Sequence, residues 1–256
     1  MTKGLSKSIA ALVGMLICGA TSADTATDIP KNVLDALADP RRPAEQRDLD
    51  TARHAARVIT FAQVTSGERV LDFMPGSGYF TRIFSDVVGP KGHVYALLHS
   101  EQIANCPPRE IAGTRSIERD PSYQNVTVLT RSLSKFSIPQ KLDLIWTSQN
   151  YHDLHDSFLG PADVAALNRA FFGALKPGGV FLVIDHVAEP NSGLRDTDTL
   201  HRIDPVRMKN EIEAAGFVLE SESDVLRNPN DGHHLTVFDP SIRGNTDQVT
   251  YLFRRP

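Results

Sequence analysis

Cysteine is scarce in this sequence, since Cys18 and Cys106 are its only two cysteines in 256 residues. Cys18 lies in an N-terminal segment that we expect to be removed, which leaves one thiol and no possibility of an internal disulfide. The fold must therefore be stabilised by the packing of a hydrophobic core. A chain of this length with 41% hydrophobic residues can bury a sizeable core.

Basic residues are not in excess, because 27 Lys and Arg stand against 31 Asp and Glu. This balance argues against a nucleic-acid partner. No apolar run is long enough to cross a membrane, which takes roughly 20 residues. The longest run extends from Ile9 to Ala20. Internal repeats and low-complexity tracts are also missing, and nothing in the sequence predicts an oligomeric state.

The N-terminus has the pattern of a secretory signal peptide. Lys3 and Lys7 precede the apolar run, and the small residues Thr21-Ser22-Ala23 follow it. We predict cleavage after Ala23, hence a signal peptide at 1–23, export to the periplasm or the medium, and no membrane attachment afterwards. Residues 24–47 are polar and are expected to form an arm with a short helix at Lys31–Ala38. Residues 48–256 are expected to form a single domain.

Within 48–256, apolar strands alternate with helices. Helices are predicted from Asp48, around Phe80–Val88, at Ala162–Leu175 and at Pro205–Ala215. The predicted strands are "RVLDFM", "GHVYALL", "NVTVLT", "LDLIWTS", "VFLVIDHV", "FVLESESDVL" and "VTYLFRR". This alternation predicts a doubly wound α/β sheet, in which ligands bind outside the carboxyl ends of the strands.

A glycine-rich turn, "DFMPGSGYF", follows the first predicted strand. Backbone N–H groups and a helix N-terminus would converge there on a ligand. Gly76 and Gly78 lack the third glycine of a dinucleotide fingerprint, and no P-loop motif is present, so NAD and P-loop nucleotides are disfavoured. Asp72 at the strand end suits the ammonium group of S-adenosylmethionine (SAM) better than a pyrophosphate. Alternatively, the turn is a purely structural β–α connection.

A ribose-binding acid should follow about 20 residues after the turn. Leu98 or His99 fills the usual position, and Glu101 is the nearest acid. Glu101 either reaches the ribose hydroxyls or is a solvated residue at the start of a helix. Met74 stands where such turns normally have glycine, which predicts a loop that sits differently or a narrowed pocket.

Five stretches occur in a characteristic order: "VLDFMPGSGYFTRIF", "GPKGHVYAL", "LDLIWTSQNYHDLHD", "ALKPGGVFLVIDH" and "EAAGFVL". In them the chain resembles the class I SAM-dependent methyltransferases. "NYHDLH", "DTDTLHRID" and "FDPSIRGNTD" resemble, more narrowly, a group of exported predicted methyltransferases. The resemblance implies a Rossmann-like, seven-stranded, mostly parallel sheet with an antiparallel last strand, and SAM lying across the tips of the first strands. We assign the cofactor contacts to Asp72, Met74, Pro75, Gly76, Ser77, Gly78, Glu101, Ser132, Leu133 and Asn150.

"SQNYHDLHDS" follows the fourth predicted strand and belongs at the same edge. Methyl transfer mainly requires alignment of the nucleophile with the methyl carbon. A hydroxyl acceptor also needs a base, and histidine suits this role. We therefore predict His152 as the base, Asp153 or Asp156 as its orienting carboxylate, and Tyr151 as a wall of the methyl site. Structural roles for these residues in the loop are the alternative.

Substrate contacts are predicted for His186, His201 and Arg243. The histidines match no tight metal-ligand spacing, so no metal is predicted. The leading prediction is SAM-dependent methyl transfer, guessed to be O-methylation, to a small molecule. A non-catalytic periplasmic protein that binds a nucleoside or another small ligand on the same fold is an alternative, and so is a different SAM-linked reaction.

Overall fold

A computed structural model describes Met1 and residues 28–105, 107–159 and 162–256. The predicted signal peptide, apart from Met1, lies outside the described residues, as does Cys106. Seven strands form one sheet in the order β3-β2-β1-β4-β5-β7-β6. Their bounds are β1 (Arg69–Phe73), β2 (His93–His99), β3 (Val126–Arg131), β4 (Leu142–Ser148), β5 (Leu175–His186), β6 (Val218–Ser223) and β7 (Gln248–Arg254).

The first five strands are parallel, and β7 pairs antiparallel with both β5 and β6. The prediction of a seven-stranded, mostly parallel sheet with an antiparallel last strand is thus confirmed. The helices are α1 (Lys31–Leu37), α2 (Ala44–Arg47), α3 (Ala55–Phe61), α4 (Tyr79–Val88), α5 (Ser100–Asn105), α6 (Pro108–Ile117), α7 (Val164–Ala174), α8 (Thr197–Leu200) and α9 (Pro205–Glu213). Short 3-10 turns occur at Pro121–Tyr123, Leu133–Lys135, His152–His155 and Ser157–Leu159.

The helix predicted from Asp48 begins only at Ala55. His54, the residue before it, has a left-handed backbone with φ 46°, which no helical residue adopts. Residues 48–54 therefore form turns. The apolar positions Ala55 and Ile59 are buried as their helical spacing predicts.

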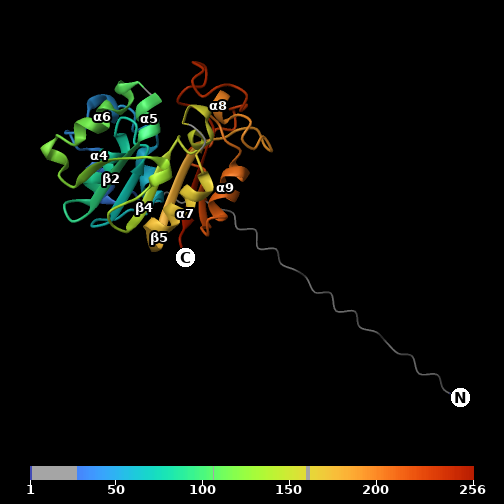
Figure 1. Cartoon of the computed structure of the whole chain (residues 1–256), viewed down its shortest axis with the longest axis horizontal. Coiled ribbons are helices and arrows are strands. Elements are labelled where there is room, and N and C mark those ends of the chain that lie inside the picture. The colour runs from blue at the N-terminus through green and yellow to red at the C-terminus, as the bar shows by residue number, and fades with distance from the viewer. Residues whose placement is uncertain (2–27, 106, 160–161) are drawn as a thin grey trace.

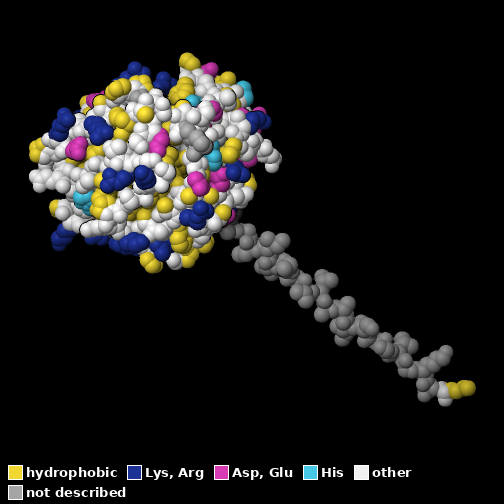
Figure 2. Space-filling view, in the orientation of Figure 1, with side chains coloured by type: hydrophobic (Ala, Val, Ile, Leu, Met, Phe, Trp, Pro, Cys, Tyr) yellow, Lys and Arg dark blue, Asp and Glu magenta, His cyan; other side chains and the backbone are white. Residues whose placement is uncertain are grey.

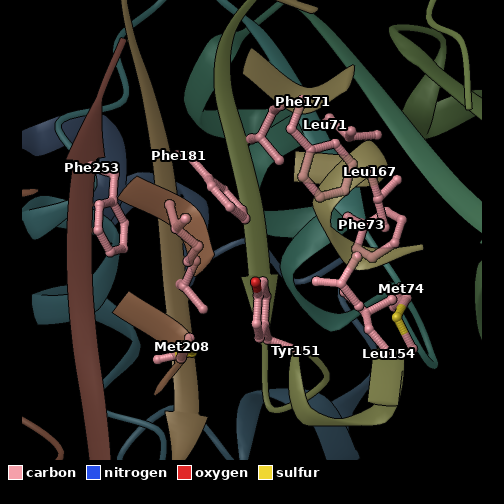
Figure 3. Close-up of a cluster of buried hydrophobic side chains, with 14 of the residues drawn as sticks. Leu71, Phe73, Met74, Tyr151, Leu154, Leu167, Phe171, Phe181, Met208 and Phe253 are labelled. Carbon is pink, nitrogen blue, oxygen red and sulfur yellow. The ribbon is translucent and has the colours of Figure 1, made fainter. Parts of the chain in front are cut away.

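The sheet has a hydrophobic cluster on each face. One cluster contains residues of α7 and α9, among them Phe171 and Met208, packed on strand residues such as Phe181 (Figure 3). The other contains residues of α1, α3 and α4 around Trp146, which contacts Phe80 and Phe84. This three-layer packing fixes where each strand ends and so positions the loops of the site.

The segment 24–47, predicted as an arm, packs on the domain in its described part. Val33 and Ala36 of α1 are buried in the same cluster as α4. Gln46 of α2 donates from Nε2 to the carbonyl oxygen of Ser77, in the glycine loop. This segment therefore contributes to the core and supports the loop after β1.

The loops that follow the parallel strands gather at one edge of the sheet. In Figure 1, α5, which follows β2, and α8, which follows β5, both lie at the top of the molecule. The face in Figure 2 carries basic and acidic side chains interspersed with hydrophobic ones. Among the described residues, no helix is long and apolar enough to cross a membrane.

Candidate active site

The glycine loop after β1 opens toward unoccupied space. Gly76 has φ 55°, and a Cβ added there would meet no atom within 4 Å. Gly78 has φ 78°, and Tyr79 begins α4 directly after it. Left-handed backbone, room at Gly76 and a helix N-terminus together form a cradle that a ligand can enter without displacing protein atoms.

The outer side of this loop is tied down by residues that the sequence did not indicate. Arg82 donates from Nη1 to the carbonyl oxygens of Ser77, at 2.9 Å, and Gly78, at 3.1 Å. Thr114 of α6 donates to the carbonyl oxygen of Gly76 at 2.9 Å. Gly113 approaches so closely that a Cβ there would lie 2.3 Å from the Ser77 carbonyl oxygen. The loop is therefore rigid on its protein side and open on the other.

Met74 keeps the backbone conformation that the usual glycine would adopt. Its φ is 61°, and its side chain is 3% exposed in the cluster that also contains Phe73 and Leu154 (Figure 3). A left-handed non-glycine residue costs about 1–3 kcal/mol, which burial of the side chain offsets. The methionine thus points into the core. Pro75, next to it, accepts a 2.8 Å bond from the Gly78 N–H.

Asp72, at the base of the loop, is buried and accepts a 2.6 Å hydrogen bond from the Thr81 hydroxyl. Burial raises the pKa of this carboxyl to about 7, although its bonds with Thr81 lower it. A nearby positive charge would offset the cost of ionising this carboxyl. This is the electrostatic setting expected for a counter-charge to a ligand's ammonium group.

Glu101, Ser132 and Leu133 are brought together, although they come from different segments. The Glu101 carboxylate accepts from the Ser132 hydroxyl at 2.6 Å and from the Leu133 N–H at 3.2 Å. They adjoin a pocket of about 380 Å³ lined by Glu101, Leu133, Ser134, Phe136, Leu159, Ala162, Asp163, Ala166, Leu167 and Ala170. His99, in the position of the usual acid, is fully buried with its Nδ1 accepting from the Gln102 N–H.

A second pocket, of about 370 Å³, lies at the ends of β4 and β5. It is lined by Leu49, Ala52, Arg53, Phe80, Ser148, Gln149, Ile184, His186, Leu226, Val237, Phe238, Arg243, Gly244 and Gln248. Two of the predicted substrate contacts, His186 and Arg243, line it. Arg53 and Phe238 were not predicted, because each comes from a loop whose position no periodicity reveals.

Asn150 connects the glycine loop to the end of β4. Its side-chain amide donates to the carbonyl oxygen of Met74 at 3.2 Å and to that of Ser148. β1, which leads into the glycine loop, lies between β2 and β4 in the sheet. The glycine loop, Glu101 after β2 and the residues of the second pocket that follow β4 therefore belong to the same edge of the sheet.

His152 is buried, with 2% of its surface exposed, and both of its ring nitrogens face partners. Nδ1 lies 2.7 Å from Asp185 Oδ1, and the His152 backbone N–H donates to Asp185 Oδ2 at 2.7 Å. Nε2 lies 3.1 Å from Asp153 Oδ1 and 3.3 Å from His201 Nδ1. The orienting carboxylate on Nδ1 is thus Asp185, at the end of β5, whereas Asp153 or Asp156 was predicted.

The carboxylates around His152 dominate its titration. Burial alone would lower the pKa of His152, but Asp185 and Asp153 outweigh it and raise the pKa well above its ordinary value. The ring has no nitrogen free to face an acceptor directly. If His152 acts as the base for an acceptor in the second pocket, the proton would therefore have to reach it through Asp153 or His201.

Tyr151 lies in the core. Its hydroxyl donates to Glu211 at 3.2 Å and accepts from the Asn168 amide at 2.7 Å, between α9 and α7. His155 pairs with the same Glu211 at 3.0 Å. The predicted wall of the methyl site is thus a buried anchor for the loop that carries His152.

Four potential metal ligands meet beside this loop: His152, Asp153, Asp156 and His201. One ligand atom from each lies within 4.8 Å of all the others. Spacing along the sequence did not reveal this group, because His201 is supplied by a separate segment after β5.

The family model matches the part of the chain that contains the glycine loop and Glu101. Residues 45–129 match the family model of protein-L-isoaspartate(D-aspartate) O-methyltransferase. A protein-L-isoaspartate O-methyltransferase of Ignicoccus hospitalis is 27% identical over 50% of this chain and 52% of its own. A ubiquinone/menaquinone biosynthesis C-methyltransferase of Vibrio cholerae is 30% identical over 53% of this chain and 48% of its own. The chain spans about half the length of these two curated relatives.

Solved structures share the fold over most of the chain. A SAM-dependent methyltransferase of Mesorhizobium loti superposes with a TM-score of 0.57 and 20% identity, covering 81% of this chain and 100% of its own. The [4+2]-cyclase SpnF superposes with a TM-score of 0.57 and 17% identity, covering 88% of this chain and 91% of its own. The chain thus has the fold of these SAM-dependent methyltransferase structures, and part of it is similar in sequence to methyltransferases.

Proposed function

We propose that this protein transfers a methyl group from SAM to an oxygen of a small molecule. The observation that carries the proposal is that the open glycine loop and two pockets, one lined by Glu101 and one by His186, follow the carboxyl ends of strands in the same sheet. Methyl transfer needs two ligands brought together at one point. Two pockets at the sheet edge that also carries the open glycine turn suit that need.

The residues present fit SAM. Gly76 leaves space where a Cβ would intrude, Asp72 supplies a buried counter-charge, and Glu101 with the Leu133 N–H provides an acceptor and a donor at the neighbouring pocket. SAM, when bound, supplies a methyl group on a positively charged sulfur. The protein would hold both ligands in place and exclude water from the space between them.

The pocket at His186 suits an acceptor with an apolar body and an anionic or polar end. Its apolar wall includes Phe80 and Phe238, and Arg53 and Arg243 provide positive charge. Arginine binds carboxylates and other oxyanions through paired N–H groups. Phe238 and Arg243 lie outside the family match at 45–129, whereas Arg53 and Phe80 lie within it, so the match covers only part of this pocket. O-methylation is our choice because the polar groups of this pocket suit an oxygen nucleophile.

A different reaction on the same fold is the second candidate. It is favoured by the buried His99 in the position of the usual ribose-binding acid. A [4+2]-cyclase with this fold illustrates that the architecture does not dictate methyl transfer. Such a protein would bind SAM or a nucleoside-like ligand without consuming it.

We also propose that the protein is exported, on the strength of the lysines, apolar run and small residues before Asp24. Fusion of a reporter after residue 30 tests this. Reporter activity outside the cytoplasm is expected, and cytoplasmic retention would contradict it.

Methyl transfer is tested with the purified chain, SAM carrying a labelled methyl group, and a panel of small hydroxylated carboxylic acids. We expect label in an acceptor and release of S-adenosylhomocysteine. SAM that is bound but recovered unchanged with every acceptor would favour the second candidate.

A further inference from the structure

The side chains of His152, Asp153, Asp156 and His201 form a compact group that neither the glycine loop nor the pocket lining uses. We propose that this group, called here the His152 cluster, is a binding site for a divalent transition-metal ion such as Zn²⁺. Two imidazoles and two carboxylates are a donor set that such ions accept readily. Mg²⁺ and Ca²⁺ prefer oxygen ligands alone.

The distances within the His152 cluster suit one ion. His152 Nε2 lies 3.1 Å from Asp153 Oδ1 and 3.3 Å from His201 Nδ1. His201 Nδ1 lies 3.6 Å from Asp153 Oδ1 and 3.8 Å from Asp156 Oδ2. Zinc bonds of about 2.0–2.1 Å at tetrahedral angles place neighbouring ligand atoms about 3.3 Å apart. Small side-chain adjustments would therefore complete the coordination.

Asp156 gives an independent indication of a missing cation. The residue is 1% exposed, and in the described part of the chain neither carboxylate oxygen has a hydrogen-bond partner. A buried carboxylate without partners is costly, whereas a metal ion would satisfy it. Proton sharing among the histidines does not supply the missing bond, because the closest ring nitrogen, His201 Nδ1, is 3.8 Å away.

Asp185 prepares His152 for this role. A carboxylate only accepts hydrogen bonds, so the proton between them lies on Nδ1, 2.7 Å from Asp185. A metal ion that displaces the proton facing Asp153 would find the lone pair of Nε2 directed at the cluster. A carboxylate behind the far nitrogen of a histidine is the usual support of a metal ligand. The same carboxylate also holds the His152 backbone N–H, which fixes the ring's position.

The His152 cluster adjoins the pocket proposed for the acceptor. The ring of His201 packs against Phe238, with centroids 4.8 Å apart, and Phe238 lines that pocket. A cation here would place a Lewis acid near an acceptor oxygen and lower the pKa of its hydroxyl. This use of the ion rests on the proposed methyl transfer, whereas binding of the ion does not.

The test is Zn²⁺ titration of the full, metal-depleted chain by calorimetry, without SAM or acceptor, with Co²⁺ absorption spectroscopy as a second readout. We expect one ion per chain, micromolar affinity or better, and a Co²⁺ spectrum typical of mixed nitrogen and oxygen ligands. Asp156→Asn and His201→Ala should each weaken binding at least about tenfold, as loss of a ligand or its support does. His201 is partly exposed, so its removal should leave the fold intact.

Matched controls are Asp198→Asn and His234→Ala, which change an acid of α8 and an exposed histidine outside the cluster. Both should bind Zn²⁺ like the unmodified chain. Absence of stoichiometric binding, or equal affinity in the cluster variants and the controls, would overturn the proposal. Because no methyl transfer is measured, failure here is distinct from failure of the proposed function.

Discussion

The two halves of this sheet edge differ in how closely they follow known proteins. The half formed by β1, β2 and β3 contains the glycine loop and Glu101, which lie within the matched residues 45–129, although the rest of the lining of the Glu101 pocket lies beyond them. The half formed by β4, β5 and the loops before β7 contains the second pocket and the His152 cluster. The first half therefore indicates the cofactor, and the second carries whatever is particular to this protein.

The largest expected effect of a single change is at Gly76. Gly76→Val would place a β-branched side chain at φ 55° in the open space of the loop, which its backbone and the ligand both disfavour. We expect SAM affinity to fall more than about 100-fold, equivalent to about 3 kcal/mol. Calorimetric titration with SAM measures this loss of affinity. Gly173→Ala, a helical glycine with no neighbour within 4 Å, is the control and should bind normally.

A smaller effect is expected at Asp72. Asp72→Asn removes the counter-charge, and SAM affinity should fall about 10- to 100-fold, or about 1.4–3 kcal/mol. The raised pKa of about 7 means that the folded protein holds the Asp72 proton more tightly than the unfolded chain. Stability from this group is therefore present at low pH and is lost as pH rises through 7.

The ionised carboxyl is the form that attracts a cationic ligand. SAM affinity of the unmodified protein should consequently increase between pH 6 and pH 8, while Asp72→Asn should show a flat profile over that range. Calorimetry across this pH range tests the predicted increase in SAM affinity, and unfolding midpoints measured in parallel test the predicted decrease in stability. Parallel slopes in the two proteins would show that Asp72 does not carry the effect.

Arg243 allows the second half to be tested separately. Arg243→Ala should raise the KM for an anionic acceptor about tenfold or more and leave the SAM dissociation constant unchanged, because this side chain lines only the second of the two pockets. Steady-state kinetics with each ligand varied in turn separates the two constants. An equal change in both would mean that the pockets are not independent.

The smallest effect on binding is expected at Met74. Met74→Gly relieves the left-handed strain but removes a buried side chain, so the free energy of unfolding should fall by about 1–3 kcal/mol. SAM affinity should stay within about threefold, because the side chain points into the core. Denaturant unfolding and calorimetry measure the two quantities. A large gain in affinity would instead show that Met74 narrows the cofactor pocket.

The positions of the strands along the chain and of the glycine loop were predictable because they depend on local patterns. Apolar runs bounded by turns located the strands, and Gly76 and Gly78 located the loop. The surroundings of His152 were not predictable, since Asp185 and His201 reach it from two other segments. The prediction that Tyr151 forms a wall of the methyl site was wrong for a related reason. At the start of the short 3-10 turn, Tyr151 points into the core, whereas the adjacent His152 points into the His152 cluster.

Calorimetric titration of the unmodified chain with SAM at neutral pH tests the central claim most directly. We expect one SAM per chain with micromolar affinity, with competition by S-adenosylhomocysteine and none by NAD. Absence of binding at millimolar SAM by a folded chain would contradict it.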